Sequence, residues 1–208
     1  MKLYFLGTGT SQGIPVIGSD HPVCLSNNPK DKRLRTAALI TVNNVNIAID
    51  CGPDFRQQML KAACNSLQAI LFTHEHADHT AGLDDIRPFN FKQGPMPIYA
   101  EARVISNLKE RFGYIFETKN RYPGAPAITT NEIKNFNDFF IQDIKITPIR
   151  ALHGWLEIFG FRIENFAYLT DVKTMSQVER DKLKNIDVMV VNALRISHHE
   201  THFSLQEA

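Results

Sequence analysis

Residues 69–79, Ala-Ile-Leu-Phe-Thr-His-Glu-His-Ala-Asp-His, decide how this 208-residue sequence is interpreted. The first half, Ala69–Thr73, is a short apolar run that predicts a buried strand. Directly after it stand three histidines and an aspartate: His74, His76, Asp78 and His79. The imidazoles of His74 and His76 can project to one side because the residues are two apart, and the other two fall on the following turn. Imidazole and carboxylate groups at this spacing favour a site for zinc, iron or manganese. The alternative is a histidine-rich loop satisfied by its own hydrogen bonds.

The patterns on either side predict a mixture of strands, hairpins and helices rather than a regular strand–helix repeat. Strands are predicted at residues 2–6, 36–42, 45–50, 139–149, 148–152, 158–163, 166–170 and 187–191. Helices are predicted at about 52–64, 101–112 and 176–185. Asn43-Asn44 predicts a two-residue hairpin turn, because Asn tolerates the left-handed conformation. Residues 7–35 and 113–131 are predicted to be loops.

Composition and charge limit the class of protein. The length and the 43% hydrophobic content favour a single globular domain over residues 1–208. A net charge of +1 argues against general attraction to nucleic acid or an anionic membrane. No stretch approaches 18 apolar residues, so no transmembrane helix is expected. Three cysteines favour reduced thiols in the cytoplasm over a disulfide framework.

Further metal ligands would have to come from other parts of the chain. His153 and Asp171 each stand at the end of a predicted strand, where loops build sites. Taken alone, a histidine or an aspartate at such a place is usually structural.

Together these residues resemble the metallo-β-lactamase superfamily, over essentially the whole chain. The resemblance implies an α/β fold, an αββα sandwich of two mixed sheets flanked by helices, with two divalent metal ions, zinc or manganese, at the sheet edges. It implies these ligands: His74, His76 and His153 on one metal, Asp78 and His79 on the other, and Asp171 bridging both.

Three other segments sharpen the resemblance: Leu6–Pro15 (LGTGTSQGIP), Asp50–Arg56 (DCGPDFR) and Gly82–Pro88 (GLDDIRP). They look like the phosphoribosyl 1,2-cyclic phosphodiesterase branch, with the tRNA 3′-endonucleases as more distant relatives. The resemblance implies hydrolysis of a small phosphodiester, cyclic in that branch, by a hydroxide bridging the metals, and a homodimer. Asp78 would also orient the nucleophile, and Asp50 would support the ligands from behind. Arg56 and Arg87 are candidates for phosphate contact or for structural ion pairs, and the structural interpretation is favoured.

The resemblance also implies a candidate proton donor in the C-terminal stretch. His202 matches the family's His-x-Ser/Thr motif, read as the donor to the leaving group, and His199 is the second choice. The alternative is a solvated histidine-rich loop. Ser204 and Glu207 form a capping-box pattern, which predicts a helix from about residue 205.

The sequence departs from the family at two places. The family has one more histidine ligand on a strand after the last helix, whereas this sequence stops at Ala208. The C-terminal helix and strand are therefore expected to be truncated, and a weakened second metal site is the alternative. Near the N-terminus, close relatives carry a structural zinc. Here only His21 and Cys24 could bind it, with two more ligands needed from elsewhere. The alternative is a surface histidine and a semi-buried thiol.

Two other functions compete with a small-molecule phosphodiesterase. A tRNA 3′-processing-type endonuclease of the same fold would want a basic surface or arm. The loop at 113–131 supplies only Lys119 and Arg121. A non-catalytic binding module with a degenerate metal site is supported only by the missing last ligand.

Overall fold

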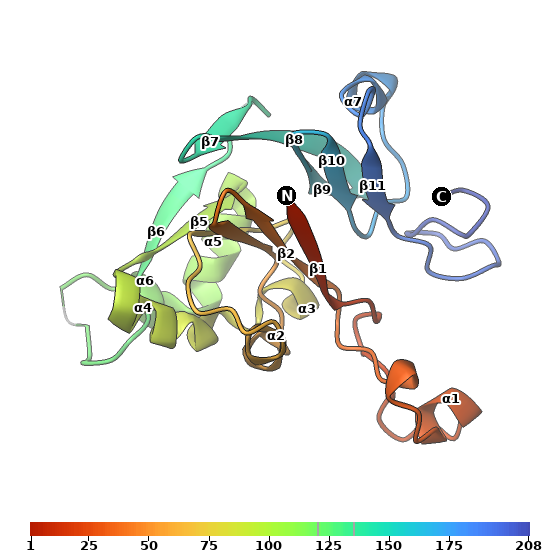
Figure 1. Ribbon diagram of the computed structural model, residues 1–208, viewed down its shortest axis with the longest axis horizontal. Coiled ribbons are helices and arrows are strands. Elements are labelled where there is room, and N and C mark those ends of the chain that lie inside the picture. The colour runs from red at the N-terminus through yellow and green to blue at the C-terminus, as the bar shows by residue number, and fades with distance from the viewer. Residues whose placement is uncertain (120, 135) are drawn as a thin grey trace. The chain divides into compact units, whose positions relative to one another are not determined.

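The computed structural model describes residues 1–119, 121–134 and 136–208 (Figure 1). Its contacts divide the chain into two compact units, Met1–Glu132 and Ile133–Ala208. We call them the N-terminal unit and the C-terminal unit. Each contains one mixed sheet with helices, so the predicted fold class is confirmed. The single domain over 1–208 stays a prediction. Among the described residues, no helix has the length and apolar content needed to cross a membrane.

The sheet of the N-terminal unit has its six strands in chain order. They are β1 (Lys2–Gly7), β2 (Ala37–Val42), β3 (Val45–Ile49), β4 (Ala69–Leu71), β5 (Met96–Ala100) and β6 (Ile128–Glu132). The first three pair antiparallel and the rest pair parallel. Asn43 and Asn44 join β2 to β3 with φ angles of 48° and 67°, as the predicted hairpin turn requires. The parallel part brings β4, and the segment that follows it, to the middle of the sheet.

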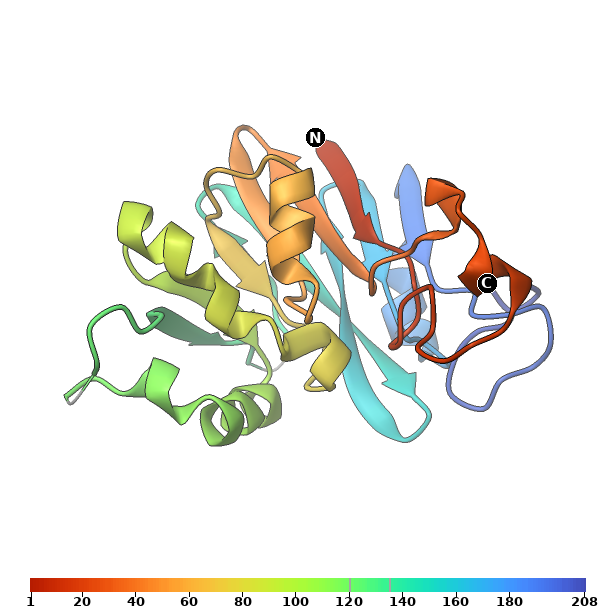
Figure 2. The ribbon, with the colours of Figure 1, turned by 90° about the horizontal axis from the view of Figure 1, so that it is seen from below.

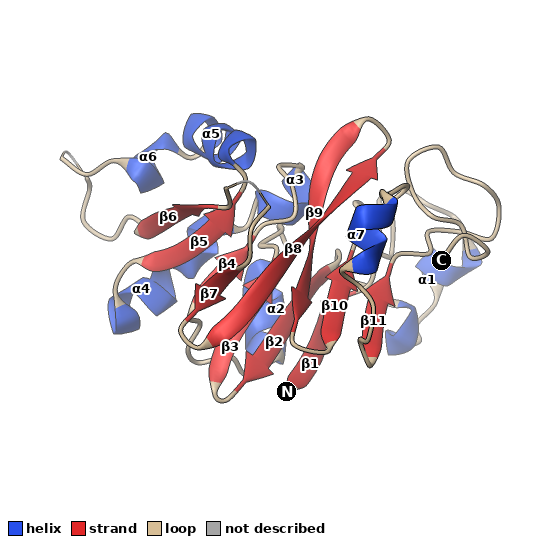
Figure 3. Cartoon of the chain, turned by 90° about the horizontal axis from the view of Figure 1, so that it is seen from above, coloured by secondary structure: helices blue, strands red, loops and turns tan. Residues whose placement is uncertain are grey.

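Helices cover this sheet, and Figure 1 shows α2, α4 and α5 on one side of it. The helices are α1 (Pro22–Leu25), α2 (Phe55–Lys61), α3 (Ala77–Thr80), α4 (Arg87–Gln93), α5 (Ala102–Arg111) and α6 (Gly113–Phe116), with 3₁₀ turns η1 (Pro29–Asp31) and η2 (Leu83–Ile86). Figure 3 shows α5 and α6 beside β5 and β6. The core between sheet and helices contains Phe55, Phe72, Ile98 and Leu108, all fully buried. Burying each such side chain contributes about 1.5–3 kcal/mol.

The sheet of the C-terminal unit has the order β11-β10-β9-β8-β7. Its strands are β7 (Phe139–Ile141), β8 (Ile144–His153), β9 (Leu156–Ile163), β10 (Phe166–Leu169) and β11 (Val188–Val191). Among the described strands of this sheet, only β10 and β11 pair parallel. The long β8–β9 hairpin is cyan in Figure 2. The helix α7 (Gln177–Asp181) begins after Ser176, whose hydroxyl accepts a hydrogen bond from the Glu179 N–H.

Four predicted segments are wrong. The loop expected at 7–35 contains the short helix α1 and the 3₁₀ turn η1. Residues 139–149 are not one strand, because Gln142 (φ 53°) and Asp143 turn the chain between β7 and β8. The loop expected at 113–131 contains α6 and most of β6, a half-exposed edge strand, and residue 120 lies outside the described residues. After Ser204 the chain forms a turn rather than a helix. The Ser204 N–H nevertheless donates to the Glu207 carboxylate at 2.7 Å, as a capping box would.

Candidate metal centre

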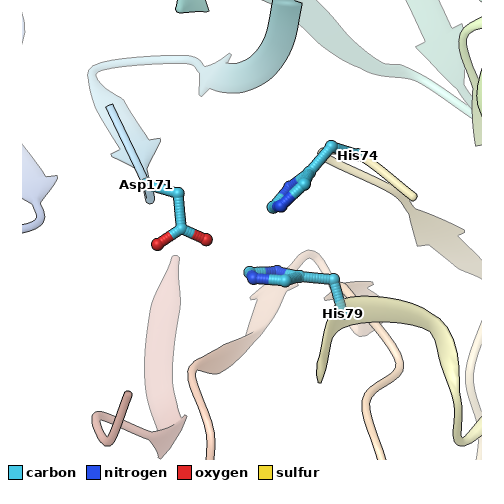
Figure 4. Close-up of side chains that lie close together, drawn as sticks. All are labelled: His74, His79 and Asp171. Atoms are coloured by element: carbon cyan, nitrogen blue, oxygen red, sulfur yellow. The ribbon is translucent and has the colours of Figure 1, made fainter. Parts of the chain in front are cut away.

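The segment His74–His79, here called the ligand loop, follows β4 and includes the first three residues of α3. The ring nitrogens Nε2 of His74 and Nδ1 of His76 face one another at 2.9 Å. The rings of His74 and His79 lie 4.2 Å apart, and Figure 4 shows them side by side. Oδ2 of Asp78 lies 3.3 Å from Nε2 of His79. The ligand loop therefore brings the four predicted side chains of this unit together.

A buried carboxylate supports the ligand loop from behind. Asp50, at the end of β3, has no exposed surface and contacts Nδ1 of His79 at 2.7 Å. It also accepts hydrogen bonds from the Thr73 N–H at 2.8 Å and the Thr73 hydroxyl at 2.9 Å. Burial raises the pKa of Asp50, and His79 and Thr73 oppose that rise. Since an ionised carboxylate only accepts hydrogen bonds, it places the His79 proton on Nδ1 and leaves Nε2 for a metal.

The change Asp50→Asn is expected to lower the zinc affinity about 10- to 100-fold, because partners that orient a ligating histidine have effects of this size. The amide keeps the shape of the side chain but offers only one acceptor oxygen where three donors converge. Competition with a chromogenic chelator measures the affinity. The matched control is Asp143→Asn in the exposed β7–β8 turn, which should bind zinc like the parent. Equal affinity for both variants would contradict this role of Asp50.

Two close backbone contacts hold the ligand loop against the end of β3. A Cβ atom on Gly52 would lie 2.0 Å from the carbonyl oxygen of Asp78, and one on Gly82 would lie 2.0 Å from the carbonyl oxygen of Gly52. The Cys51 N–H donates to the His79 carbonyl at 2.8 Å, and the Gly82 N–H donates to the Cys51 carbonyl at 2.8 Å. The loop is thus fixed in place by main-chain contacts that only glycine permits at these two positions.

Arg111, on α5, fixes the other side of the ligand loop. Its guanidinium donates to the carbonyl oxygen of Glu75 at 3.1 Å and to the hydroxyl of Thr80 at 2.8 Å. Arg103 forms an ion pair with the Glu75 carboxylate. Sequence reasoning missed both arginines, because their only signal is a position on a helix, 28 and 36 residues after Glu75.

The C-terminal unit gathers a second group, here called the histidine cluster: His153, Asp171, His199 and His202. His153 is the last residue of β8, and Asp171, also drawn in Figure 4, follows β10 with a φ of 58°. Nδ1 of His202 lies 3.3 Å from the Asp171 carboxylate. The rings of His153 and His202 are 4.5 Å apart, and those of His199 and His202 are 5.0 Å apart. Desolvation lowers the pKa of His199, and the nearby His202 and Arg195 lower it further.

The main chain also orients His153. Its Nδ1 donates to the carbonyl oxygen of Thr201 at 2.8 Å, which leaves Nε2 as the lone-pair nitrogen. Each residue that the sequence nominated as a ligand of the two-metal centre or as proton donor therefore belongs to one of the two groups. The neighbouring His198 instead lies near Lys173 and Glu207.

His21 and Cys24 are arranged differently from the ligands of a structural zinc site. Nδ1 of His21 accepts a hydrogen bond from the Val23 N–H at 3.2 Å and caps α1. The Cys24 sulfur accepts one from the Val16 N–H at 3.4 Å. Within the described ranges, neither residue joins a group of three ligand atoms close enough to hold a metal. The structure supports the alternative of a surface histidine and a semi-buried thiol.

The cysteines should differ in reactivity. Hydrogen bonds from the Ser19 hydroxyl and the Val16 N–H lower the pKa of Cys24, whereas burial raises the pKa of Cys51 well above that of an ordinary thiol. The thiolate is the reactive form, so at about pH 8 iodoacetamide should label Cys24 first and spare Cys51 until the protein unfolds. Peptide mass spectrometry of a time course, with a urea-unfolded sample as the control, measures this order. Labelling of Cys51 in the folded protein at the rate of Cys24 would contradict it.

The structural interpretation of Arg87 is supported by its contacts. Its guanidinium lies 2.6 Å from the Asp84 carboxylate and 3.2 Å from the Tyr122 hydroxyl. Tyr114 donates to the same carboxylate at 2.6 Å. Arg56 is exposed on α2.

Comparisons with known proteins agree on the kind of fold. The family model described as the beta-lactamase superfamily domain matches residues 45–208. The crystal structure of a diphosphatase from the PhnP family has a TM-score of 0.89 and 35% identity, over 99% of this chain and 78% of that chain. An octanoyltransferase of Porphyromonas gingivalis is 40% identical over 210 residues, which cover 100% of this chain and 42% of that protein. A ribonuclease Z of Saccharolobus islandicus is 23% identical over 186 residues, which cover 88% of this chain and 53% of that protein. The chain spans about half the length of these curated relatives.

Proposed function

The chain belongs to the β-lactamase superfamily, and from that premise we propose that it is a metal-dependent phosphodiesterase acting on a small phosphodiester. The observation that carries the proposal is the ligand loop, whose four side chains lie together over the buried carboxylate of Asp50. The 35% identity to a diphosphatase of the PhnP family supports phosphoryl chemistry. In its more specific form, the proposal takes the substrate to be a cyclic phosphodiester.

The donor set fits divalent transition metals. Neutral imidazole and carboxylate are the ligands that zinc and manganese accept, and the ring nitrogen of His79 opposite Asp50 is set up as a lone-pair donor. We assign two metal ions to these ligands: His74, His76, Asp78, His79, His153 and Asp171. When bound, the metals supply Lewis-acid activation of water and of the phosphoryl oxygens.

The residues of the chain would do the rest of the chemistry. Asp78 would orient the attacking water as well as bind metal. His202, whose Nδ1 lies 3.3 Å from the Asp171 carboxylate, would in its protonated form donate the Nε2 proton to the leaving oxygen. His199 is the second candidate for this role. A poor leaving group develops more negative charge on its oxygen and gains more from protonation as it leaves. Loss of the proton donor should therefore reduce the rate most for substrates with poor leaving groups.

The test compares three chromogenic substrates on the purified protein: bis(p-nitrophenyl) phosphate, p-nitrophenyl phosphate and p-nitrophenyl acetate. Activity should be highest on the diester, disappear with EDTA and return with zinc or manganese, and elemental analysis should give two metals per chain. Hydrolysis of the acetate alone would refute the proposal. Less than one metal per chain without diester hydrolysis would favour the non-catalytic binding module.

The match to ribonuclease Z keeps a tRNA endonuclease as a second candidate. The net charge of +1 argues against it, because long polyanions are bound through many phosphate contacts. Cleavage of a tRNA precursor at low salt would favour the endonuclease. The octanoyltransferase name belongs to a protein of which more than half lies outside the match, so it does not assign acyl transfer to the matched part.

A homodimer is also proposed, and light scattering tests it.

A further inference from the structure

The tip of the β8–β9 hairpin carries the protein's only tryptophan. His153 pairs with Leu156, so the connecting loop is Gly154-Trp155. Gly154 has a φ of 63°, which suits the first position of a type II′ turn. The Trp155 side chain is 91% exposed, so it contributes almost nothing to a core.

Trp155 is held close to the histidine cluster by the turn itself. His153, two residues before it, is bonded through Nδ1 to the Thr201 carbonyl. A Cβ atom on Gly154 would lie 2.9 Å from the Thr201 methyl group, so the turn packs directly against the segment between His199 and His202. The indole is therefore attached to a rigid turn at the edge of the cluster rather than to a free loop.

Tryptophan is an unusual residue for this position. Two-residue turns favour glycine and small polar residues, and neither turn geometry nor packing explains an indole there. A flat aromatic ring held out in water offers one thing that a polar turn residue cannot, a stacking face for another ring.

We propose that Trp155 is a specificity-determining residue that stacks on a planar ring carried by the substrate, so that the preferred substrate is a nucleotide-type phosphodiester. This inference rests on the proposed phosphodiesterase function and names its substrate class. The ring would lie on the indole while the phosphodiester group extends toward the histidine cluster.

Binding is tested without catalysis by the intrinsic fluorescence of the single tryptophan. Metal-free protein is titrated with AMP and, in parallel, with ribose 5-phosphate, which has the same sugar and phosphate but no base. AMP should quench the emission saturably, and ribose 5-phosphate should not. Free N-acetyltryptophanamide controls for collisional quenching. Equal responses to the two ligands, or none to either, would overturn the inference even if the enzyme proves active.

Kinetics supply the second arm, with the variants Trp155→Leu and Trp155→Phe. The leucine variant should raise KM about tenfold for a 2′,3′-cyclic nucleotide, since stacking is worth about this much per base, and leave kcat within twofold. It should leave KM unchanged for a cyclic diester without a ring, and phenylalanine should restore most of the loss. Phe140→Leu, which removes an aromatic side chain 61% exposed on β7, is the matched control and should change neither KM.

The two proposals fail in different ways. If no diester is hydrolysed, the proposed phosphodiesterase function is wrong, and the fluorescence titration still tests whether Trp155 stacks on a base. If diesters are hydrolysed but Trp155→Leu raises KM equally with and without the ring, the stacking role fails alone.

Discussion

The change His76→Ala is expected to abolish the metal-dependent phosphodiesterase activity and leave the protein folded. His76 is exposed, and its ring contacts the His74 ring edge-on at a centroid distance of 4.5 Å, so its removal leaves no cavity. As a ligand it should matter more than an orienting residue, whose loss costs about 10- to 100-fold in metal affinity. We therefore expect activity to fall by more than about 100-fold. Hydrolysis of bis(p-nitrophenyl) phosphate, elemental analysis and the melting temperature measure the three parts of this result.

The control for that experiment is His21→Ala. This exposed histidine lies in the same unit but caps α1 and is no part of the ligand loop. It should keep both its metal and its activity. Undiminished activity in His76→Ala would remove His76 from the metal centre.

Gly52→Ala is expected to have the largest effect on stability. The added Cβ atom would lie 2.0 Å from the Asp78 carbonyl oxygen, a distance that forces one of the two chain segments to move. Neither can move easily, because the Cys51 N–H is bonded to the His79 carbonyl and Asp50 to the His79 ring. We expect a loss of about 3 kcal/mol in the free energy of unfolding. The melting temperature should fall by about 6–12 °C, and bound metal should be lost.

Gly113→Ala is the matched control, since it adds the same atom where no heavy atom lies within 4 Å. Gly113 is the first residue of α6, and a helical position gains slightly from alanine. Urea denaturation of both variants gives the comparison. A Gly52→Ala protein as stable as Gly113→Ala would show that the ligand loop is not fixed by this contact.

The sequence was most informative where the site is local. The ligand loop could be predicted because its four side chains are contiguous and follow a strand whose apolar pattern is plain. The grouping of Asp171 with His202 spans 31 residues of chain, and no local pattern predicts that these two side chains meet. The supporting contacts of Arg111 depend on where a helix packs, which no local pattern encodes.

The errors in the fold have local causes. Gln142 adopts a left-handed φ of 53°, a conformation more typical of Asn or Gly. The sequence therefore predicts a continuous strand where the structure has the β7–β8 turn. The strand β6 contains Thr129, Thr130 and Asn131 and pairs on one edge only, so it lacks the apolar run of a central strand. At Ser204 the cap interaction forms, but a cap alone does not create a helix.

The contact between Gly82 and the main chain at Gly52 also restricts how this sequence can evolve. Every other amino acid has a Cβ atom, and at Gly82 it would meet a carbonyl oxygen at 2.0 Å and the Cβ of Phe55 at 2.8 Å. Any single substitution of Gly82 is therefore expected to be destabilising, because the clash comes with the Cβ atom and does not depend on the rest of the side chain. We therefore expect substitutions near the site at the surrounding positions, while Gly52 and Gly82 both remain glycine.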